Sequence, residues 1–355
     1  MDTVLYMPFT TQDDDRFQHF ERLIEHAALT DIIKPGNLVA IKLHVGEKNR
    51  DTYVEPGLVR VLVEHIQKLE AKPFLTDTNV LYHSQRSNAV DHILLAHEHG
   101  FSIERMGCPF IVADGLLGRD ERKVSINGRH YQEVPIASLA ADADAIVVVS
   151  HFTGHLGTGF GATIKNLGMG FSARKGKLSQ HSDMAPFIRQ KSCTLCGACV
   201  RNCPVAAISL GSKAAVIDAD TCIGCGECIS VCRFHAVSFN WSTSSPLLQQ
   251  KMAEHALGVH KQKQGRVAYI NILTQVTQDC DCIPRQQEPL FPDIGALAGR
   301  DPVAVDQASY DLVKEQAGKT IEALSYPNLD GTEQIRFAEE IGLGSRKYEL
   351  VHLDK

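Results

Sequence analysis

Four apolar runs rich in β-branched residues recur along the chain and predict the strands of a sheet. They lie at residues 39–45 (VAIKLHV), 73–78 (PFLTDT), 145–150 (AIVVVS) and 267–273 (VAYINIL). Continuous apolar runs of this length are typical of strands that are buried on both faces. A fifth run at 348–353 (YELVHL) predicts a final strand.

Helical patterns lie between these runs. One begins near Pro56 and places apolar residues at the spacing of one helix face through Leu69. Another begins at Asp301-Pro302, where Asp suits the N-cap and Pro the first turn, and runs to about Gln316. Residues 331–342 predict a third helix. The alternation predicts an α/β fold with a mostly parallel sheet and flanking helices.

An internal cysteine repeat interrupts this pattern. Residues 193–203 read CTLCGACVRNC and residues 222–232 read CIGCGECISVC, and the stretch between them predicts two short strands around a Gly-Ser turn. Since an apolar strand follows at 267–273, we expect a small α+β, ferredoxin-like insertion at 184–241. It would divide one α/β body into a first part, 1–183, and a second part, 242–355.

The spacing within the repeat is typical of two [4Fe-4S] clusters. Three thiolates at intervals of three positions can hold one cluster, while the fourth cysteine of each run binds the other cluster. The alternative is a pair of structural zinc sites, but zinc usually takes two Cys-x-x-Cys pairs separated by a longer loop. We therefore expect one cluster on Cys193, Cys196, Cys199 and Cys232, and the other on Cys203, Cys222, Cys225 and Cys228.

A stretch rich in histidine and glycine follows the run at 145–150. A glycine-rich loop at the carboxyl end of a parallel strand is where α/β proteins bind ligands, and its free N–H groups attract anions. The alternative is that the glycines only pack closely and the histidines lie at the surface. The candidates for catalysis are His155, Lys165 and His181, and those for cofactor binding are His151, Gly159, Gly161 and Asn166.

Three cysteines lie outside the repeat. Cys108 stands alone and is expected in the core. Cys280 and Cys282 are two residues apart, so in an extended segment both sulfurs would face one side. They could be structural thiols, hold a soft metal or form a redox pair, and we count both among the candidates for catalysis.

Polar residues at strand ends are weaker candidates for the same rim of the sheet. Lys42, His44 and Glu47 follow one predicted strand, and residues 77–79 (Asp-Thr-Asn) end another. A further metal ion or an anionic ligand at this rim is a hypothesis that these residues support.

Composition narrows the class of protein. The 355 residues are 44% hydrophobic with a net charge of −6, which gives no support to binding of nucleic acid or of an anionic membrane. The acidic start does not resemble a signal peptide, and no apolar stretch is long enough for a membrane span. We expect a cytoplasmic protein, a redox partner protein and an anaerobic setting, with a small-molecule substrate as a hypothesis.

Together these residues resemble uncharacterised domain family 362, in its form with an inserted two-cluster ferredoxin. The motifs that carry the resemblance run nearly end to end: AIKLHVGE (40–47), TDTN (76–79), SHFTGH (150–155), GFGATIKNLGMG (159–170), CDC (280–282), DIGALAGRDPVAVDQASYD (293–311) and EEIGLGSRKYELV (339–351). The resemblance implies an iron–sulfur protein and supplies no reaction.

A second resemblance is to the lactate racemase superfamily, whose members hold a nickel pincer nucleotide on a lysine. There, one histidine precedes the lysine by ten residues and another follows it by sixteen, as His155, Lys165 and His181 do here. This resemblance implies that Lys165 is the attachment point, His181 the nickel ligand and His155 the acid–base residue. It implies a remote ligand contact for Asp77. Asn166 and Leu167 after the lysine depart from the pattern.

The leading hypothesis is an iron–sulfur redox protein that transfers electrons to or from a site on the α/β body. If the chain is an enzyme, it is an iron–sulfur oxidoreductase. The alternatives are an electron carrier that docks to a larger redox enzyme, a protein with a nickel-pincer-like cofactor, and a metal or cluster delivery protein.

Overall fold

The computed structural model describes residues 2–182, 185–240 and 243–353, and an eight-stranded sheet organises the body. In spatial order its strands are β16 (Tyr348–His352), β1 (Asp2–Pro8), β15 (Gly295–Gly299), β14 (Val267–Leu273), β7 (Ala145–His151), β2 (Leu38–Lys42), β3 (Lys72–Asp77) and β4 (Phe110–Val112). The five predicted strands are all present.

The sheet is mostly parallel, as predicted. Strands β14, β7, β2, β3 and β4 run in one direction, so their carboxyl ends share one edge. The exception is β15, which is antiparallel to both β14 and β1. Sequence reasoning predicted neither β15 nor β1.

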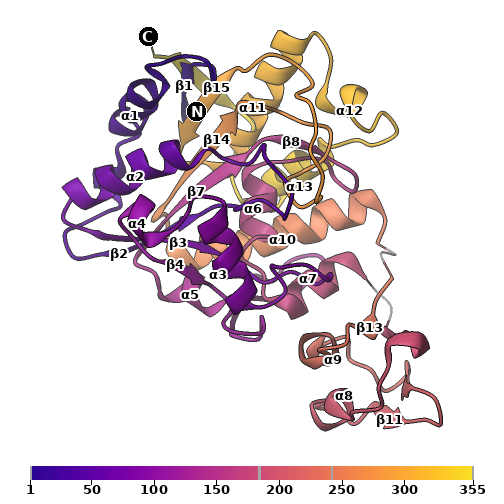
Figure 1. The fold of residues 1–355 in the computed structure, drawn as a ribbon. Helices are drawn as coiled ribbons and strands as arrows, with labels where there is room; N and C mark the ends of the chain where they lie inside the picture. The colour runs from indigo at the N-terminus through magenta and orange to yellow at the C-terminus, as the bar shows by residue number, and fades with distance from the viewer. Residues whose placement is uncertain (1, 183–184, 241–242, 354–355) are drawn as a thin grey trace.

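Helices cover both faces of the sheet (Figure 1). Along β7, Ile146 and Val148 belong to the apolar core on one face and Val147 to the core on the other, which explains the uninterrupted apolar run. One face is covered by α1 (Arg16–His26) and α2 (Pro56–Lys68), and the other by α10 (Ser245–Lys263) and α11 (Pro302–Ala317).

The predicted helix starts are confirmed. Pro56 opens α2, and the Asp301 side chain accepts hydrogen bonds from the backbone N–H groups of Val303 and Ala304 at the start of α11. The predicted helix near the C-terminus is α13. Other elements of the body are α3 (Ala89–Glu98), α4 (Ile103–Met106), α5 (Ser138–Asp142), α12 (Ile321–Leu324), α13 (Glu333–Glu340), the 3₁₀ turn η1 (Leu29–Asp31) and the hairpin β5 (Glu121–Ser125) with β6 (Glu133–Ala137).

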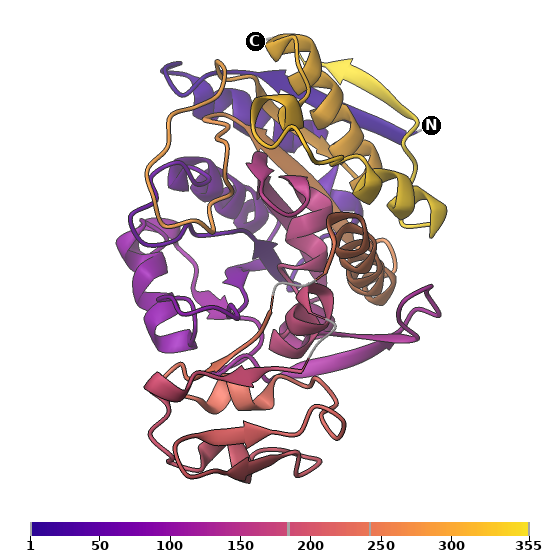
Figure 2. The ribbon, with the colours of Figure 1, turned by 90° about the vertical axis from the view of Figure 1, so that its right-hand side faces the viewer.

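Residues 185–240, called the cysteine module below, form a small unit at one end of the molecule (Figures 1 and 2). Its first and last strands form an antiparallel ladder that pairs Phe187 with Ser238. The two short strands predicted between the repeats are found as an antiparallel pair. The elements of the module are β10 (Phe187–Ile188), the 3₁₀ turn η2 (Gln190–Ser192), α8 (Ala198–Arg201), β11 (Ile208–Leu210), β12 (Ala215–Ile217), α9 (Glu227–Val231) and β13 (Val237–Ser238).

The helices in the described part of the chain include none that is both long and apolar enough to cross a membrane.

Candidate functional site

A cavity of about 1170 Å³ opens at the carboxyl edge of the parallel strands. Lys42 and His44 reach it from the end of β2, Asp77 and Thr78 from the end of β3, and His151 from the end of β7. Ligands of open α/β sheets bind at this edge, so the cavity is the candidate site of the body.

The stretch that follows β7 is more ordered than the loop we predicted. It forms a hairpin and two short helices, because its glycines allow close approaches: a Cβ on Gly168 would lie 2.1 Å from the carbonyl oxygen of Met252. His155 ends the first strand of the hairpin, Lys165 lies in the first of the two helices and His181 ends the second. The elements are β8 (Thr153–His155), β9 (Gly159–Gly161), α6 (Thr163–Gly168) and α7 (Arg174–His181).

The three candidates for catalysis in this stretch, His155, Lys165 and His181, all line the cavity. Of the two glycines, Gly161 also lines it, and a Cβ there would lie 2.8 Å from Cδ of Lys165. Gly159 is absent from the lining among the described residues, and a Cβ there would lie 2.6 Å from Cα of Gly331. Gly159 thus serves close packing, while Gly161 leaves room for the Lys165 side chain.

His155 is held by its own hairpin. The backbone N–H groups of Gly157 and Thr158 both donate to Nδ1 at 3.1 Å, and the Thr158 hydroxyl lies 2.8 Å from the same nitrogen. Burial lowers the pKa of His155 well below its ordinary value, with Lys165 and His181 adding to the effect. His155 is therefore a neutral imidazole that turns Nε2 away from the hairpin.

Lys165 is a partly buried amine without a close carboxylate. Burial is the main reason why its pKa falls to about 8, with Arg86 and Lys42 lowering it further and Asp281 opposing them. Within the described ranges, its ammonium group makes no hydrogen bond or ion pair. An amine that is partly deprotonated near neutral pH can act as a nucleophile, and when protonated it can hold an anion.

His181 shares this environment. Burial, together with Lys165 and Lys177, lowers the pKa of His181 to about 3, so its ring is neutral. Lys177, one turn before it, donates to the Thr78 hydroxyl at 2.5 Å, and burial lowers its pKa to about 8. The candidate cofactor ligand His151 is different, because protein groups occupy both of its ring nitrogens: Asp281 at Nδ1, 2.9 Å, and the carbonyl of Thr274 at Nε2, 2.8 Å.

A buried chain of charges forms the floor of the cavity. Lys42 Nζ lies 2.9 Å from Asp77, and Arg86 lies 3.2 Å from the same carboxylate and 3.3 Å from Glu47. Burial alone would raise the pKa of Asp77, but Lys42, His44 and Arg86 hold it well below its usual range. Lys42 also donates to Asn166 Oδ1 at 2.7 Å, so this candidate for cofactor binding positions a lysine.

Cys280 and Cys282 lie in a tight turn and are joined by a disulfide. The prediction of an extended segment is wrong here: the Cα atoms are 5.3 Å apart, against about 6.6 Å for two residues of an extended strand. The N–H of Ile283 closes the turn on the carbonyl of Cys280 at 3.0 Å. A ring nitrogen of His155 and the two sulfurs lie within 4.8 Å of one another, close enough to share a metal ion once the sulfurs are reduced.

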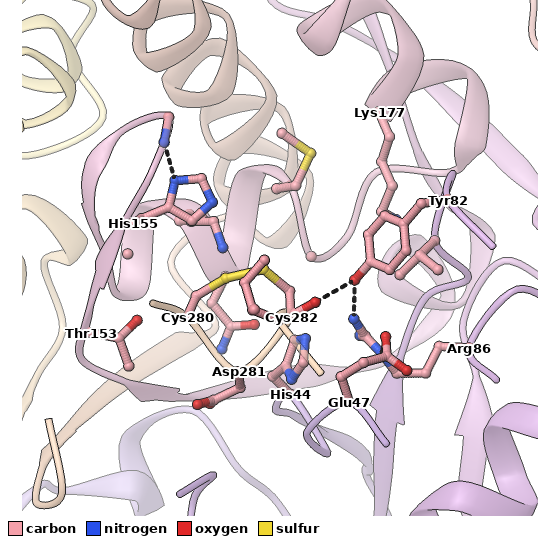
Figure 3. Close-up of a pocket in the computed structure, with 18 of the residues that line it drawn as sticks. His44, Glu47, Tyr82, Arg86, Thr153, His155, Lys177, Cys280, Asp281 and Cys282 are labelled. Carbon is pink, nitrogen blue, oxygen red and sulfur yellow. Dashed lines mark hydrogen bonds and ion pairs between the residues drawn. A yellow bond between two sulfur atoms is a disulfide. The ribbon is translucent and has the colours of Figure 1, made fainter. Parts of the chain in front are cut away.

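Asp281, between the two cysteines, also lines the cavity, and its carboxylate lies on the far side of the disulfide from Tyr82 (Figure 3). Its carboxylate accepts the His151 bond and lies 3.6 Å from Nε of Arg50. Its own carbonyl accepts the N–H of Glu47 at 2.9 Å. Asp281 therefore anchors the turn, and the anchor directs both sulfurs to the cavity side.

The eight cysteines of the module gather around two small cavities, four to each. Backbone N–H groups point at the sulfurs: Ala207 N lies 3.2 Å from Cys203 Sγ and Ala236 N lies 3.2 Å from Cys232 Sγ. Cys193, Cys196, Cys199 and Cys232 surround one cavity, and Cys203, Cys222, Cys225 and Cys228 surround the other.

Three consecutive residues join this module to the large cavity. Leu81 packs in the same apolar cluster as Cys199 and Cys228, and the His83 ring stacks on His235 of the module at 3.8 Å between centroids. Tyr82, between them, donates to the carbonyl of Cys282 at 3.3 Å. All three residues line the large cavity.

Sequence reasoning missed residues 81–83 and Arg86. They lie in a segment without helix or strand periodicity, so the polar run His83-Ser84-Gln85-Arg86 after TDTN was the only signal available.

The structure also shows where two other residues named from the sequence lie, Cys108 and Asn79. Cys108 lies in the core with 3% of its surface exposed, as predicted. Asn79 bonds Asp114 at 2.7 Å and is absent from the cavity lining in the described part of the chain.

Comparison with known proteins identifies a family. The model of DUF362, "Domain of unknown function (DUF362)", matches residues 39–311. The search of curated proteins found no significant match. Among solved structures, the lactate racemase apoprotein from Thermoanaerobacterium thermosaccharolyticum is similar, with a TM-score of 0.45 and 12% identity over 88% of this chain. The matched region spans 63% of that protein's length.

Proposed function

Because the chain belongs to the DUF362 family, whose description names no activity, we propose a function from the site itself: an iron–sulfur redox protein. In this proposal the cysteine module binds two [4Fe-4S] clusters, and electrons pass between the module and a small ligand held in the cavity of the body.

The cysteine module suits such clusters in its donor set and in its backbone. Each small cavity offers four thiols, the ligand number of a [4Fe-4S] cluster, and the fourth thiol of each set comes from the opposite repeat. N–H groups directed at the sulfurs, such as Ala215 N at 3.4 Å from Cys193 Sγ, stabilise bound thiolates. When bound, the clusters would supply one-electron transfer.

The cavity of the body suits a small ligand with an acidic group. Its carboxylates Asp77 and Asp281 are already paired with buried cations, whereas Lys165 has no such partner among the described residues. His44 contributes a second open position, because its buried Nε2 makes no hydrogen bond in the described ranges. A ligand that brings an anion would satisfy both groups.

A single observation carries the proposal: the cysteine module and the cavity share a wall. Leu81 and His83 line the cavity and also contact the module, through the cluster with Cys199 and through the stack on His235. A carrier that only docked to another enzyme would have no use for a cavity with charged side chains beside its own electron-transfer unit. Shared side chains between a donor and a ligand pocket keep the electron path short.

Anaerobic purification followed by metal analysis tests whether the cysteine module binds two [4Fe-4S] clusters. We expect about eight irons per chain and reduced-cluster signals in electron paramagnetic resonance. Cys196→Ser and Cys225→Ser form a matched pair, one from each set, and each is expected to lose about half of the iron. Two zinc ions per chain and no iron would contradict the proposal.

Ligand binding tests whether the cavity of the body holds a small ligand with an acidic group. Oxalate, a small dicarboxylate, should raise the melting temperature of the wild-type protein, and Lys165→Met should remove this rise without changing the iron content. Lys48→Met is a control, because Lys48 lines the cavity with an exposed side chain. An equal rise in melting temperature in the wild type and both variants would mean that oxalate binds away from Lys165.

One observation favours a second candidate function, a cofactor bound covalently to Lys165. Lys165 contributes to the lowered pKa of both His155 and His181, and all three line the cavity, so this lysine lies beside two neutral imidazoles that could hold a metal ion. A nickel-pincer-like cofactor would need this set. Intact mass of the purified chain, with nickel analysis, tests it: a mass increase on the Lys165 peptide that Lys165→Arg abolishes would support it, and an unmodified peptide without nickel would contradict it.

A further inference from the structure

The Cys280–Cys282 disulfide has no evident structural task. It closes a turn that hydrogen bonds already fix, at Ile283 within the turn and at Glu47 and Tyr82 from outside it. A crosslink over two residues also constrains little of the unfolded chain. Yet both cysteines line the cavity of about 1170 Å³, and Cys282 is only half-buried.

We propose that Cys280 and Cys282 form a reversible disulfide–dithiol couple that collects two electrons by way of the cysteine module and presents them to the ligand in the cavity. This inference rests on the proposed function, because it requires a one-electron donor in the module. It adds that the reaction in the cavity moves electrons in pairs, and that the substrate is a two-electron acceptor bearing an acidic group.

The step balances as follows. The bond between the two sulfurs breaks, each sulfur takes one electron and one proton, and two thiols result. The electrons come from a low-potential one-electron reductant of the ferredoxin class, and the protons from water in the cavity. Reoxidation by the substrate returns the disulfide. Cys282 is the sulfur that meets the substrate, since Cys280 has only 5% of its surface exposed.

Two consecutive residues, Tyr82 and His83, connect the cysteine module to the disulfide. The His83 ring stacks on His235, which lies three residues after Cys232, and Tyr82 directly precedes His83. The Tyr82 hydroxyl accepts from Arg86 at 2.7 Å and donates to the carbonyl of Cys282, so both ends of this connection are fixed. Figure 3 shows the Tyr82 hydroxyl directed at the carbonyl of Cys282 and at Arg86.

A reductive titration tests the couple. Anaerobically purified protein is oxidised with thionine, freed of the dye and titrated with dithionite while absorbance is followed. Wild-type protein should accept about four electrons per chain, two for two clusters and two for the disulfide. Cys280→Ser and Cys282→Ser should each accept about two with unchanged iron. Cys108→Ala is the matched control, a buried cysteine away from the cavity, and should still accept about four.

Alkylation identifies the thiols. Iodoacetamide followed by peptide mass spectrometry should modify Cys280 and Cys282 only after reduction, with Cys282 modified faster. Wild-type protein that holds its iron but accepts only two electrons, or whose two cysteines react before reduction, would overturn the couple and leave the clusters intact. A stoichiometric metal ion on these sulfurs would overturn it as well.

Absence of iron would instead overturn the proposed function, and the couple can still be judged then. Dithiothreitol should expose two additional thiols in the wild-type chain. If no additional thiols appear, the disulfide–dithiol couple is overturned independently of the proposed function.

Discussion

Lys42 and Asp77 form an ion pair of 2.9 Å in which neither side chain has more than 4% of its surface exposed. Lys42 ends β2 and Asp77 ends the neighbouring strand β3, so the pair joins the two strands where they reach the cavity. It also holds Arg86, which lies against the other oxygen of Asp77.

Asp77→Asn should strongly destabilise the protein, because it leaves Lys42 and Arg86 buried beside a neutral group. Loss of one partner of a buried pair costs about 3–5 kcal/mol in the free energy of unfolding. Urea denaturation measures this. Glu64→Gln is the control, since Glu64 pairs with Arg60 with both side chains 47% exposed, and such a change costs below about 1 kcal/mol. Equal losses in the two variants would show that burial is not the cause.

The amine of Lys165 should react with acylating reagents at a lower pH than other lysines. Its pKa is lowered from 10.5 to about 8, so at pH 9 most of it is deprotonated while exposed lysines are still charged. Competitive labelling with acetic anhydride, read by peptide mass spectrometry, should give a midpoint near pH 8 for the Lys165 peptide. A midpoint near 10.5 would mean that the amine is solvated.

The lowered pKa of Lys165 also predicts how the stability of the folded protein changes with pH. A lysine with a lowered folded-state pKa binds fewer protons in the folded chain than in the unfolded chain between about pH 8 and 10.5. Its contribution therefore favours folding more as pH rises through this window and opposes it below. Lys165→Met should flatten this part of the pH profile of unfolding, whereas exposed Lys48→Met should leave it unchanged.

Asp301→Ala should weaken the start of α11. The Asp301 side chain accepts from Val303 and Ala304 at 2.8 and 2.9 Å, and its second oxygen accepts from Ser345 N at 2.8 Å. Loss of a cap costs about 0.5–2 kcal/mol, and the bond to Ser345 places this one near the upper end. Thermal unfolding measures it, and Asp301→Asn, which keeps an acceptor oxygen, should recover most of the loss.

His83→Ala should loosen the contact between the module and the body without unfolding either. A ring stack contributes about 0.5–1.5 kcal/mol, so hydrogen exchange of the module should accelerate roughly two- to tenfold. Exchange in β7 and β14 should not change. Arg119→Ala is a useful comparison, because Arg119 makes an ion pair with Glu227 of the module and is exposed, as His83 is. A larger effect for Arg119 would show that charge, not stacking, holds the module.

Sequence reasoning located the strands that are apolar on both faces and missed those that are not. β7 reads as one unbroken apolar run because its residues pack alternately into two cores. β15 is Gly-Ala-Leu-Ala-Gly, whose small residues carry no strand preference. Its conformation comes from its neighbours, since it fills the space between β1 and β14.

The residues of the candidate site likewise divide into those that the sequence predicted and those that it did not. Lys42, Asp77 and Lys165 follow recognisable strands or motifs, so the rule that polar side chains gather at carboxyl strand ends located them. Tyr82 and Arg86 lie in an irregular segment whose path depends on contacts with the module and with the turn at Cys282. Such long-range contacts leave no periodic signal in the sequence.

The chain leaves the body at His181 and is back beside it at Thr243, whose N–H donates to the carbonyl of His181 at 3.3 Å. The entropy lost on closing a loop grows only slowly with its length, so a junction this narrow tolerates inserts of very different size. All eight strands of the large sheet lie outside the segment between these two residues. Evolution could therefore exchange or remove the unit at this junction as a single genetic event, while the order of strands in the body stayed the same.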